Sequence, residues 1–212
     1  MTARRLANRH HRLRPRSRNQ HWLGQVGHAA GFIALLVAAA VVTETTPSNE
    51  FWQGPIPVPG EINETLTGRN IEATVSEVRV ARSVRADTGW LGETSGIWVV
   101  VDVSVAAVVD DNRAVLGTAE LEIGSVVYSA STRPATASLA LKPLATGIPR
   151  RGTLVFEIPE TVLESEAAGD THIHLAANGD PRSDSLIVVP VDLTAVTVED
   201  TLAIESPEWD AR

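Results

Sequence analysis

Hydrophobic residues follow two different patterns along the chain. The segment 22–42 is an almost unbroken apolar run, WLGQVGHAAGFIALLVAAAVV. A helix rises about 1.5 Å per residue, so a helix of this length spans the roughly 30 Å hydrocarbon core of a bilayer. From residue 69 onward apolar and polar residues alternate, which is typical of half-buried β-strands. The pattern predicts one N-terminal transmembrane helix followed by a mostly β domain.

The strongest strand pattern covers residues 96–109. Alternate positions on one side of this strand are predicted to face the core, and they hold Ile97, Val99, Val101, Val103 and Val105. Trp98, Val100, Asp102 and Ser104 fall on the opposite face. Asp110–Asn112 is predicted to be a turn, after which residues 114–123 return as the hairpin partner of this strand.

Shorter segments show the same alternation. Strands are predicted at 71–75, 78–81, 125–130, 137–141, 152–158, 171–176 and 186–198. The alternation changes phase at Ser76-Glu77, which indicates a β-bulge. Residues 161–168 are predicted to form a helical turn with Thr161 as its cap. Roughly seven to nine short strands separated by turn signals favour a β-sandwich, with a closed barrel as the alternative.

Charge is divided unevenly along the chain. Seven arginines and no acidic residue precede the apolar run, whereas all 26 acidic residues and 11 of the 18 basic residues follow it. Positively charged flanks stay in the cytoplasm, so the N-terminus is predicted to be cytoplasmic and the C-terminal domain extracytoplasmic, at the cell membrane. An acidic exported domain argues against nucleic acid as a partner. A cleaved signal peptide, ending near Ala38-Ala39-Ala40, is the alternative to a retained anchor.

These patterns predict five parts of the chain. They are a basic cytoplasmic tail (1–21), a transmembrane signal anchor (22–42), an extended linker (43–67), a β-sandwich (68–198) and an acidic C-terminal tail (199–212). The linker prediction rests on its richness in proline, with Pro55, Pro57 and Pro59 at alternate positions.

Two blocks of sequence resemble a known family. They are Gly96–Val105, GIWVVVDVSV, and Gly147–Pro159, GIPRRGTLVFEIP, with Val191-Asp192-Leu193 closing the pattern. Over about residues 68–193 the chain is similar to the telokin-like, immunoglobulin-fold domain of unknown function found in bacterial surface lipoproteins and membrane-anchored proteins. The resemblance implies an immunoglobulin-like β-sandwich in the bacterial cell envelope, and it brings no catalytic residues.

The sequence offers little catalytic chemistry. It has no cysteine, which excludes thiolate nucleophiles and cysteine-ligated metals. His172 and His174 share one strand face at a spacing that metal sites use, but the exported part has no third histidine. Neither Gly-x-Ser-x-Gly nor a glycine-rich phosphate loop occurs. We therefore expect no catalytic, cofactor-binding or metal-binding residues.

Four residues are candidates for contact with a partner. Trp90, in a predicted loop, and Trp209, in the acidic tail, are aromatic side chains that either anchor a partner or pack in the core. Gly27 and Gly31 form a small-x-x-x-small pair, which lets membrane helices approach closely. The expected function is a non-enzymatic, membrane-anchored extracytoplasmic binding domain for another cell-envelope protein. The alternative is an accessory subunit of a membrane transporter or cell-envelope complex.

Overall fold

The computed structural model describes residues 19–45, 53–109 and 114–210, which fall into two units, Met1–Ser48 and Asn49–Arg212. The first unit contributes one uninterrupted helix, α1 (Asn19–Thr45), which contains no proline. The described apolar side chains of α1 are exposed, with Phe32, Ile33 and Leu35 at 64%, 61% and 70%. Within the described residues, no helical stretch combines the length and apolar character that a membrane crossing needs.

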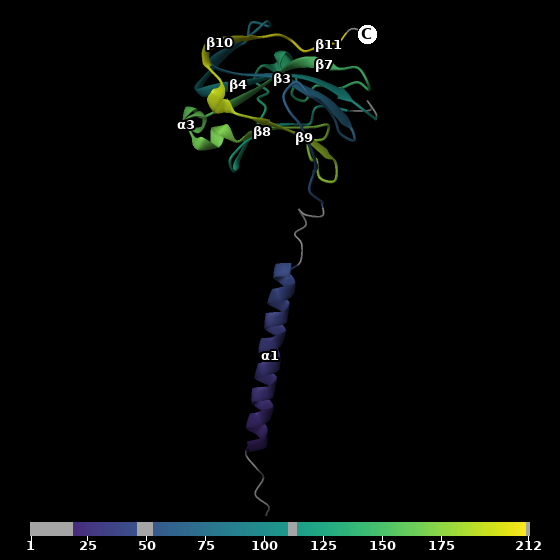
Figure 1. The fold of residues 1–212 in the computed structure, drawn as a ribbon, viewed down its shortest axis with the longest axis vertical. Helices are drawn as coiled ribbons and strands as arrows, with labels where there is room; N and C mark the ends of the chain where they lie inside the picture. Colours follow the sequence, from purple (N-terminus) through teal and green to yellow (C-terminus); the bar gives the residue numbers. More distant parts are fainter. Residues whose placement is uncertain (1–18, 46–52, 110–113, 211–212) are drawn as a thin grey trace, which may run out of the picture. The chain divides into compact units, whose positions relative to one another are not determined.

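The second unit is a sandwich of two β-sheets (Figure 1). Sheet A has the strand order β1 (Ile56–Pro59), β9 (Ser185–Val191), β8 (Thr171–Ala176), β5 (Thr118–Ile123) and β6 (Val126–Ser129). Sheet B has the order β10 (Val198–Ile204), β3 (Ile71–Ala86), β4 (Leu91–Ala107), β7 (Arg150–Ile158) and β11 (Glu208–Trp209), and β2 (Thr65–Thr67) pairs with the start of β3. The sheets share no described strand, so the chain forms a sandwich and not the alternative barrel.

The main core lies between the two sheets and follows the predicted alternation. All five residues of β4 that were predicted to face inward are buried there, as are Leu154 and Phe156 of β7 and Ile173 and Leu175 of β8. The predicted bulge is confirmed, because the register between β3 and β4 shifts between Val75 and Glu77. A second shift, between Ala81 and Ser83, was not predicted.

Sheet B also has a second, smaller core on its outer face. Trp98 and Val100 of β4, predicted to lie opposite the core, are fully buried there with Val155 of β7. The other members come from β3, β10 and a short turn, and they are Ala81, Val84, Ala86, Ala137, Leu202 and Ile204. Part of sheet B is therefore buried on both faces, as its continuous run of valines allows.

Three predicted elements differ from the structure. Residues 114–123 do not return beside β4, because β5 crosses to sheet A and pairs with β6 and β8. The predicted strand 137–141 is absent from the described strands; Ala135–Ala137 form a 3-10 turn instead, η1. The predicted helical turn at 161–168 is split into α3 (Glu160–Leu163) and η2 (Glu166–Gly169), with Pro159 and not Thr161 at the start.

The predicted domain boundaries at 67 and 199 also need correction. The linker 43–67 supplies β1, which pairs in parallel with β9, and β2. The predicted strand 186–198 ends at Val191, because Asp192 caps the short turn η3 (Leu193–Ala195) by accepting a hydrogen bond from the Thr194 N–H. The chain then enters β10, so most of the acidic tail belongs to sheet B. Local pattern missed β1 and β2 because they are short, and β1 is rich in proline.

Candidate functional site

A groove of about 780 Å³ runs across the outer face of sheet B, beside the second core. Its floor comes from alternate positions of three strands, which face away from the main core. Those floor residues are Glu72, Thr74, Ser76 and Arg79 of β3, Asp102, Ser104 and Ala106 of β4, and Arg151 and Thr153 of β7. Because pairing aligns these strands, Thr74 lies opposite Ser104, and Ser104 lies opposite Arg151. The register of these strands therefore determines which polar side chains lie side by side in the groove.

An ion pair lies in this floor. Arg79 Nη2 donates to Asp102 Oδ2 at 2.6 Å, and both side chains are about a quarter exposed. Burial raises the pKa of Asp102, because the loss of solvent penalises its carboxylate by more than the Arg79 charge favours it. The Nε atom of Arg79 is buried and makes no hydrogen bond among the described residues, although Glu77 Oε2 is 3.5 Å away. The protein therefore satisfies only part of the hydrogen-bonding capacity of the Arg79 guanidinium.

Hydroxyl groups surround the ion pair. Thr65 and Thr74 share a hydrogen bond of 2.9 Å between their Oγ1 atoms, and Ser76 Oγ donates to the carbonyl oxygen of Asp102 at 3.1 Å. Thr153 Oγ1 donates to the carbonyl oxygen of Ala137 at 3.4 Å. These hydroxyls bond to one another or to backbone oxygens. The arrangement provides donors and acceptors for a polar ligand.

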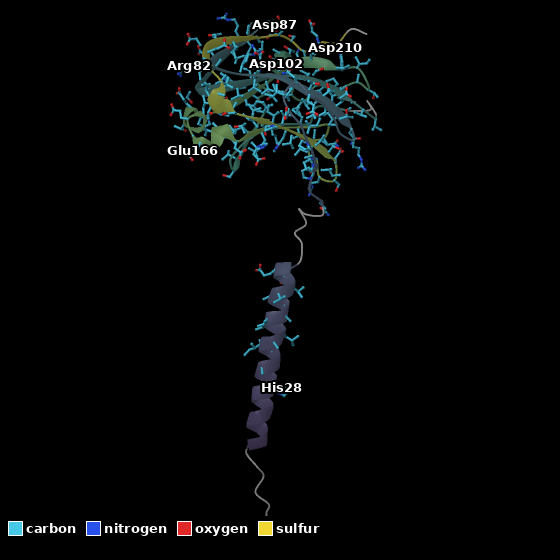
Figure 2. The ribbon with its side chains drawn as sticks, in the orientation of Figure 1. His28, Arg82, Asp87, Asp102, Glu166 and Asp210 are labelled. Atoms are coloured by element: carbon cyan, nitrogen blue, oxygen red, sulfur yellow. The ribbon has the colours of Figure 1, made fainter. Side chains whose placement is uncertain are left out.

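Residues 205–209, which we call the C-terminal strap, cover the groove. The strap leaves β10 at one edge of sheet B and reaches β11 at the opposite edge, crossing the outer face of the sheet (Figure 1). Glu205, Ser206 and Glu208 of the strap line the groove. In Figure 2, Asp87 and Asp210 mark the two ends of the strap, and Asp102 lies on the sheet beneath it.

The strap is held at both ends. The N–H and Oγ of Ser206 donate to the two oxygens of Asp87 at 2.9 and 3.0 Å, and this hydrogen bonding lowers the pKa of Asp87. At the other end Arg151 Nε lies 2.9 Å from Asp210 Oδ1. The Asp210 N–H donates to the carbonyl oxygen of Pro149 at 2.9 Å.

The groove carries an excess of negative charge. Its two arginines are each paired with an aspartate, Arg79 with Asp102 and Arg151 with Asp210. Glu72, Glu205 and Glu208 also line it, and none of the three has an ion-pair partner among the described residues. A ligand that carries positive charge is therefore favoured over an anion.

The predicted partner contacts lie elsewhere or at the margin. Trp90 is half-buried against the second core, with its ring edge-on to Trp98 at a centroid distance of 5.9 Å, so it packs within the protein. Trp209 is 44% exposed on β11, and the Arg150 guanidinium lies 4.7 Å from its ring centroid. Around Gly31 on α1 nothing lies within 4 Å of the position of a Cβ. Gly27 lies outside the residues whose surroundings are described.

His172 and His174 lie on the outer face of sheet A. Their rings are 6.4 Å apart, and His174 Nε2 is 3.5 Å from Glu122 Oε2. Burial lowers the pKa of His174, against the opposing effect of Glu122 and Glu120. Among the described residues, no three metal-ligating side chains come together.

Comparisons with known proteins assign no function to the chain. No protein-family model matches it, and no curated protein matches it. It is similar to an uncharacterised β-sandwich protein of Clostridium difficile, with 12% identity and a TM-score of 0.45 over 69% of this chain and 99% of that one. It is also similar to the yjhA protein of Bacillus subtilis, with 14% identity and a TM-score of 0.42 over 61% and 98%.

Sequence reasoning missed the groove, although part of its signal was present. Asp102 and Ser104 were correctly placed on the face of β4 opposite the core. Arg79 and Thr74 alternate with apolar residues in the same way. What the alternation could not give was the pairing of β3, β4 and β7, or the strap that closes over them.

Proposed function

We propose that this protein is a non-enzymatic, membrane-anchored binding module, displayed outside the cell, that binds another cell-envelope protein through the groove on sheet B. The observation that carries the binding role is the groove, a covered hollow lined by hydroxyl and charged groups on a sandwich that already has its own core. Its volume lies in the range of ligand-binding sites.

The anchor is proposed from the sequence of 22–42 together with α1. Helix α1 includes the whole apolar run, and its described apolar side chains are exposed, as the side chains of a membrane helix would be towards lipid. The described side chains of the helix begin at His28, so they cover only part of the run. The arginines before the run support an orientation with the N-terminus inside.

We also propose that the sandwich belongs to the telokin-like, immunoglobulin-fold class. The two sequence blocks that carry the resemblance, 96–105 and 147–159, contain most of the central strand β4 and all of its neighbour β7. They meet along one antiparallel pair, from Ile97 with Ile158 to Val105 with Arg150. The residues that carry the resemblance thus form the adjacent strands β4 and β7 of sheet B.

The alternative is an accessory subunit of a membrane complex, and the open surface around Gly31 supports it. A helix with no side chain at this position can approach a second helix closely. In that case α1 itself would take part in assembly, whereas in the leading proposal it only tethers the sandwich.

A site-specific cross-linker tests the binding role. We would place a photo-reactive side chain at Ser104 in the groove floor, or at Ser129 on exposed β6 of sheet A as the control, in the full-length protein in its native membranes. The proposal predicts a discrete protein adduct from position 104 that is lost when Thr74→Trp fills the groove. Equal adducts from both positions, or an adduct that Thr74→Trp leaves unchanged, would contradict it.

A further inference from the structure

Burial changes abruptly where β10 meets the strap. Leu202 and Ile204, the last inward residues of β10, are 5% and 2% exposed within the second core. No residue of the strap itself is buried, and Glu205, Glu208 and Trp209 are exposed. Segments that bury little apolar surface open locally at low free-energy cost. The strap can therefore separate from sheet B beyond Ile204 while both cores remain intact.

The contacts that hold the strap are polar or lie at its margins. Near Ile204 the side chain of Ser206 is fixed by Asp87, on the turn that follows β3. At the far end β11 makes only two register pairs with β7, Glu208 with Arg151 and Trp209 with Arg150. Hydrogen bonds and ion pairs at exposed positions exchange readily with water. The strap is thus held by polar contacts at each end, which we call latches: Ser206 with Asp87, and β11 with β7. No buried apolar side chain of the strap lies between them.

Between the latches the strap rests on a glycine. A Cβ at Gly152 of β7 would lie 2.9 Å from Cβ and 3.0 Å from Cγ of Pro207. Both of these atoms belong to a stiff ring joined to the backbone, so a side chain at position 152 would have to move the strap. Gly152 therefore permits the strap to close over the floor of the groove.

We propose that the strap is a movable cover, hinged after Ile204, that controls access to the floor of the groove around Ser104 and Asp102. In the closed state Ser206 and Pro207 lie on Asp87 and Gly152. In the open state the second core keeps β10 in place and the floor is exposed to a partner. The purpose of this motion rests on the proposed binding function, but the motion itself is measured without a ligand.

The chain has no cysteine, so one introduced cysteine reports access to the floor. We would measure the alkylation rate of Ser104→Cys in the full-length protein, alone and combined with Asp87→Ala, Ser206→Ala or Gly152→Val. Asp200→Ala, on β10 just before the strap, is the matched control for the loss of an aspartate, and Ser129→Cys reports on general reactivity. Thermal melting verifies that each variant is folded.

We expect the Ser104→Cys rate to rise about tenfold when either side of the Ser206–Asp87 latch is removed, and at least as much with Gly152→Val. Asp200→Ala should leave the rate unchanged, and Ser129→Cys should react at one rate in every background. If Gly152→Val does not fold, the two latch variants decide the result.

Two results would overturn the inference. One is an unchanged Ser104→Cys rate in folded Asp87→Ala and Ser206→Ala. The other is a Ser104→Cys rate equal to that of Ser129→Cys when the strap is intact. Faster alkylation in the latch variants, together with no groove-dependent cross-link from position 104, would uphold the cover and reject the proposed binding function.

Discussion

Arg79 and Asp102 form a hydrogen-bonded ion pair of 2.6 Å between neighbouring strands, in the floor of a groove with an excess of acidic residues. The pair faces away from the main core, on the row of the sheet where polar residues give way to the second core. Glu77 lies on the same row as Asp102, and Val100 lies opposite Arg79. One face of sheet B therefore combines a polar site and a packed apolar layer.

Breaking this ion pair should destabilise the protein. Arg79→Gln leaves the Asp102 carboxylate largely buried without its charge partner, and we expect a loss of about 1–3 kcal/mol of unfolding free energy. The double variant Arg79→Gln/Asp102→Asn should lose less than the sum of the two single variants, because it removes both charges. Urea unfolding followed by tryptophan fluorescence measures these values.

The control for this pair is Arg82→Gln. The ion pair of Arg82 with Glu160 is exposed, so its loss should cost at most about 1 kcal/mol. Equal losses for Arg79→Gln and Arg82→Gln would show that the groove pair has no special energetic role.

Because Val100 is fully buried in the second core, substitutions there should destabilise the protein as they would in the main core. Val100→Thr places a hydroxyl where the side chain is fully buried, at an expected cost of about 1–3 kcal/mol. The same change at Val127, which is 50% exposed on β6, should stay within about 0.5 kcal/mol. Phe156→Ala, in the main core, sets the upper reference at about 3–5 kcal/mol. Matching unfolding curves for the two valine variants would contradict the second core.

Stability should fall as the solution is acidified through the titration range of histidine. Burial lowers the pKa of His174 below its usual 6.5, so the unfolded chain binds its proton at a higher pH than the folded chain does. The unfolding free energy therefore decreases as pH drops from about 7 through 6.5 towards the folded pKa. Thermal melting between pH 7.5 and about 5 measures this loss.

Two variants separate His174 from other titrating groups. His174→Gln should remove the part of the acid-dependent loss that His174 causes. Glu122→Gln should enlarge that loss, because the Glu122 carboxylate favours the protonated imidazole. An identical pH dependence in wild-type protein and His174→Gln would rule out this source.

Substitutions in α1 distinguish the proposed tether from the alternative assembly subunit. If α1 only tethers the sandwich, Gly31→Leu should leave association in the membrane unchanged. If α1 packs against another helix through Gly27 and Gly31, the same change should weaken cross-linked complexes while the sandwich melts normally. We expect the tether result, with Ala30→Leu as the control for added volume on another face of the helix.

The sequence was sufficient wherever structure depends on local alternation. The inward face of β4, the bulge after Val75 and the extent of β8 follow from the period-two pattern, because each side of a strand meets a different environment. The short alternating segments also favoured the two-sheet sandwich, although a closed barrel, which buries one side of each strand equally well, remained as the alternative.

The alternation of apolar and polar residues could not predict which strands pair when they lie far apart in the sequence. β5 belongs to sheet A although it follows β4 of sheet B in the chain, and the predicted turn at 110–112 lies outside the described residues. β10 pairs with β3, more than a hundred residues earlier in the chain. The second core depends on those pairings, since Leu202 and Ile204 reach Val100 only after β10 has joined sheet B. The groove and its strap require both sheet order and chain crossing, so local sequence could supply their residues but not their assembly.

The central claim, that the sandwich is displayed outside the cell on a retained anchor, is tested most directly by a reporter that is active only outside the cytoplasm. We would fuse it after Arg212 or before Met1 and sequence the N-terminus of the mature chain. We predict activity at the C-terminus, silence at the N-terminus, a mature chain that still contains the arginines, and less activity when those arginines become glutamines. A silent C-terminal fusion, or a mature chain that begins near Val41, would contradict the account.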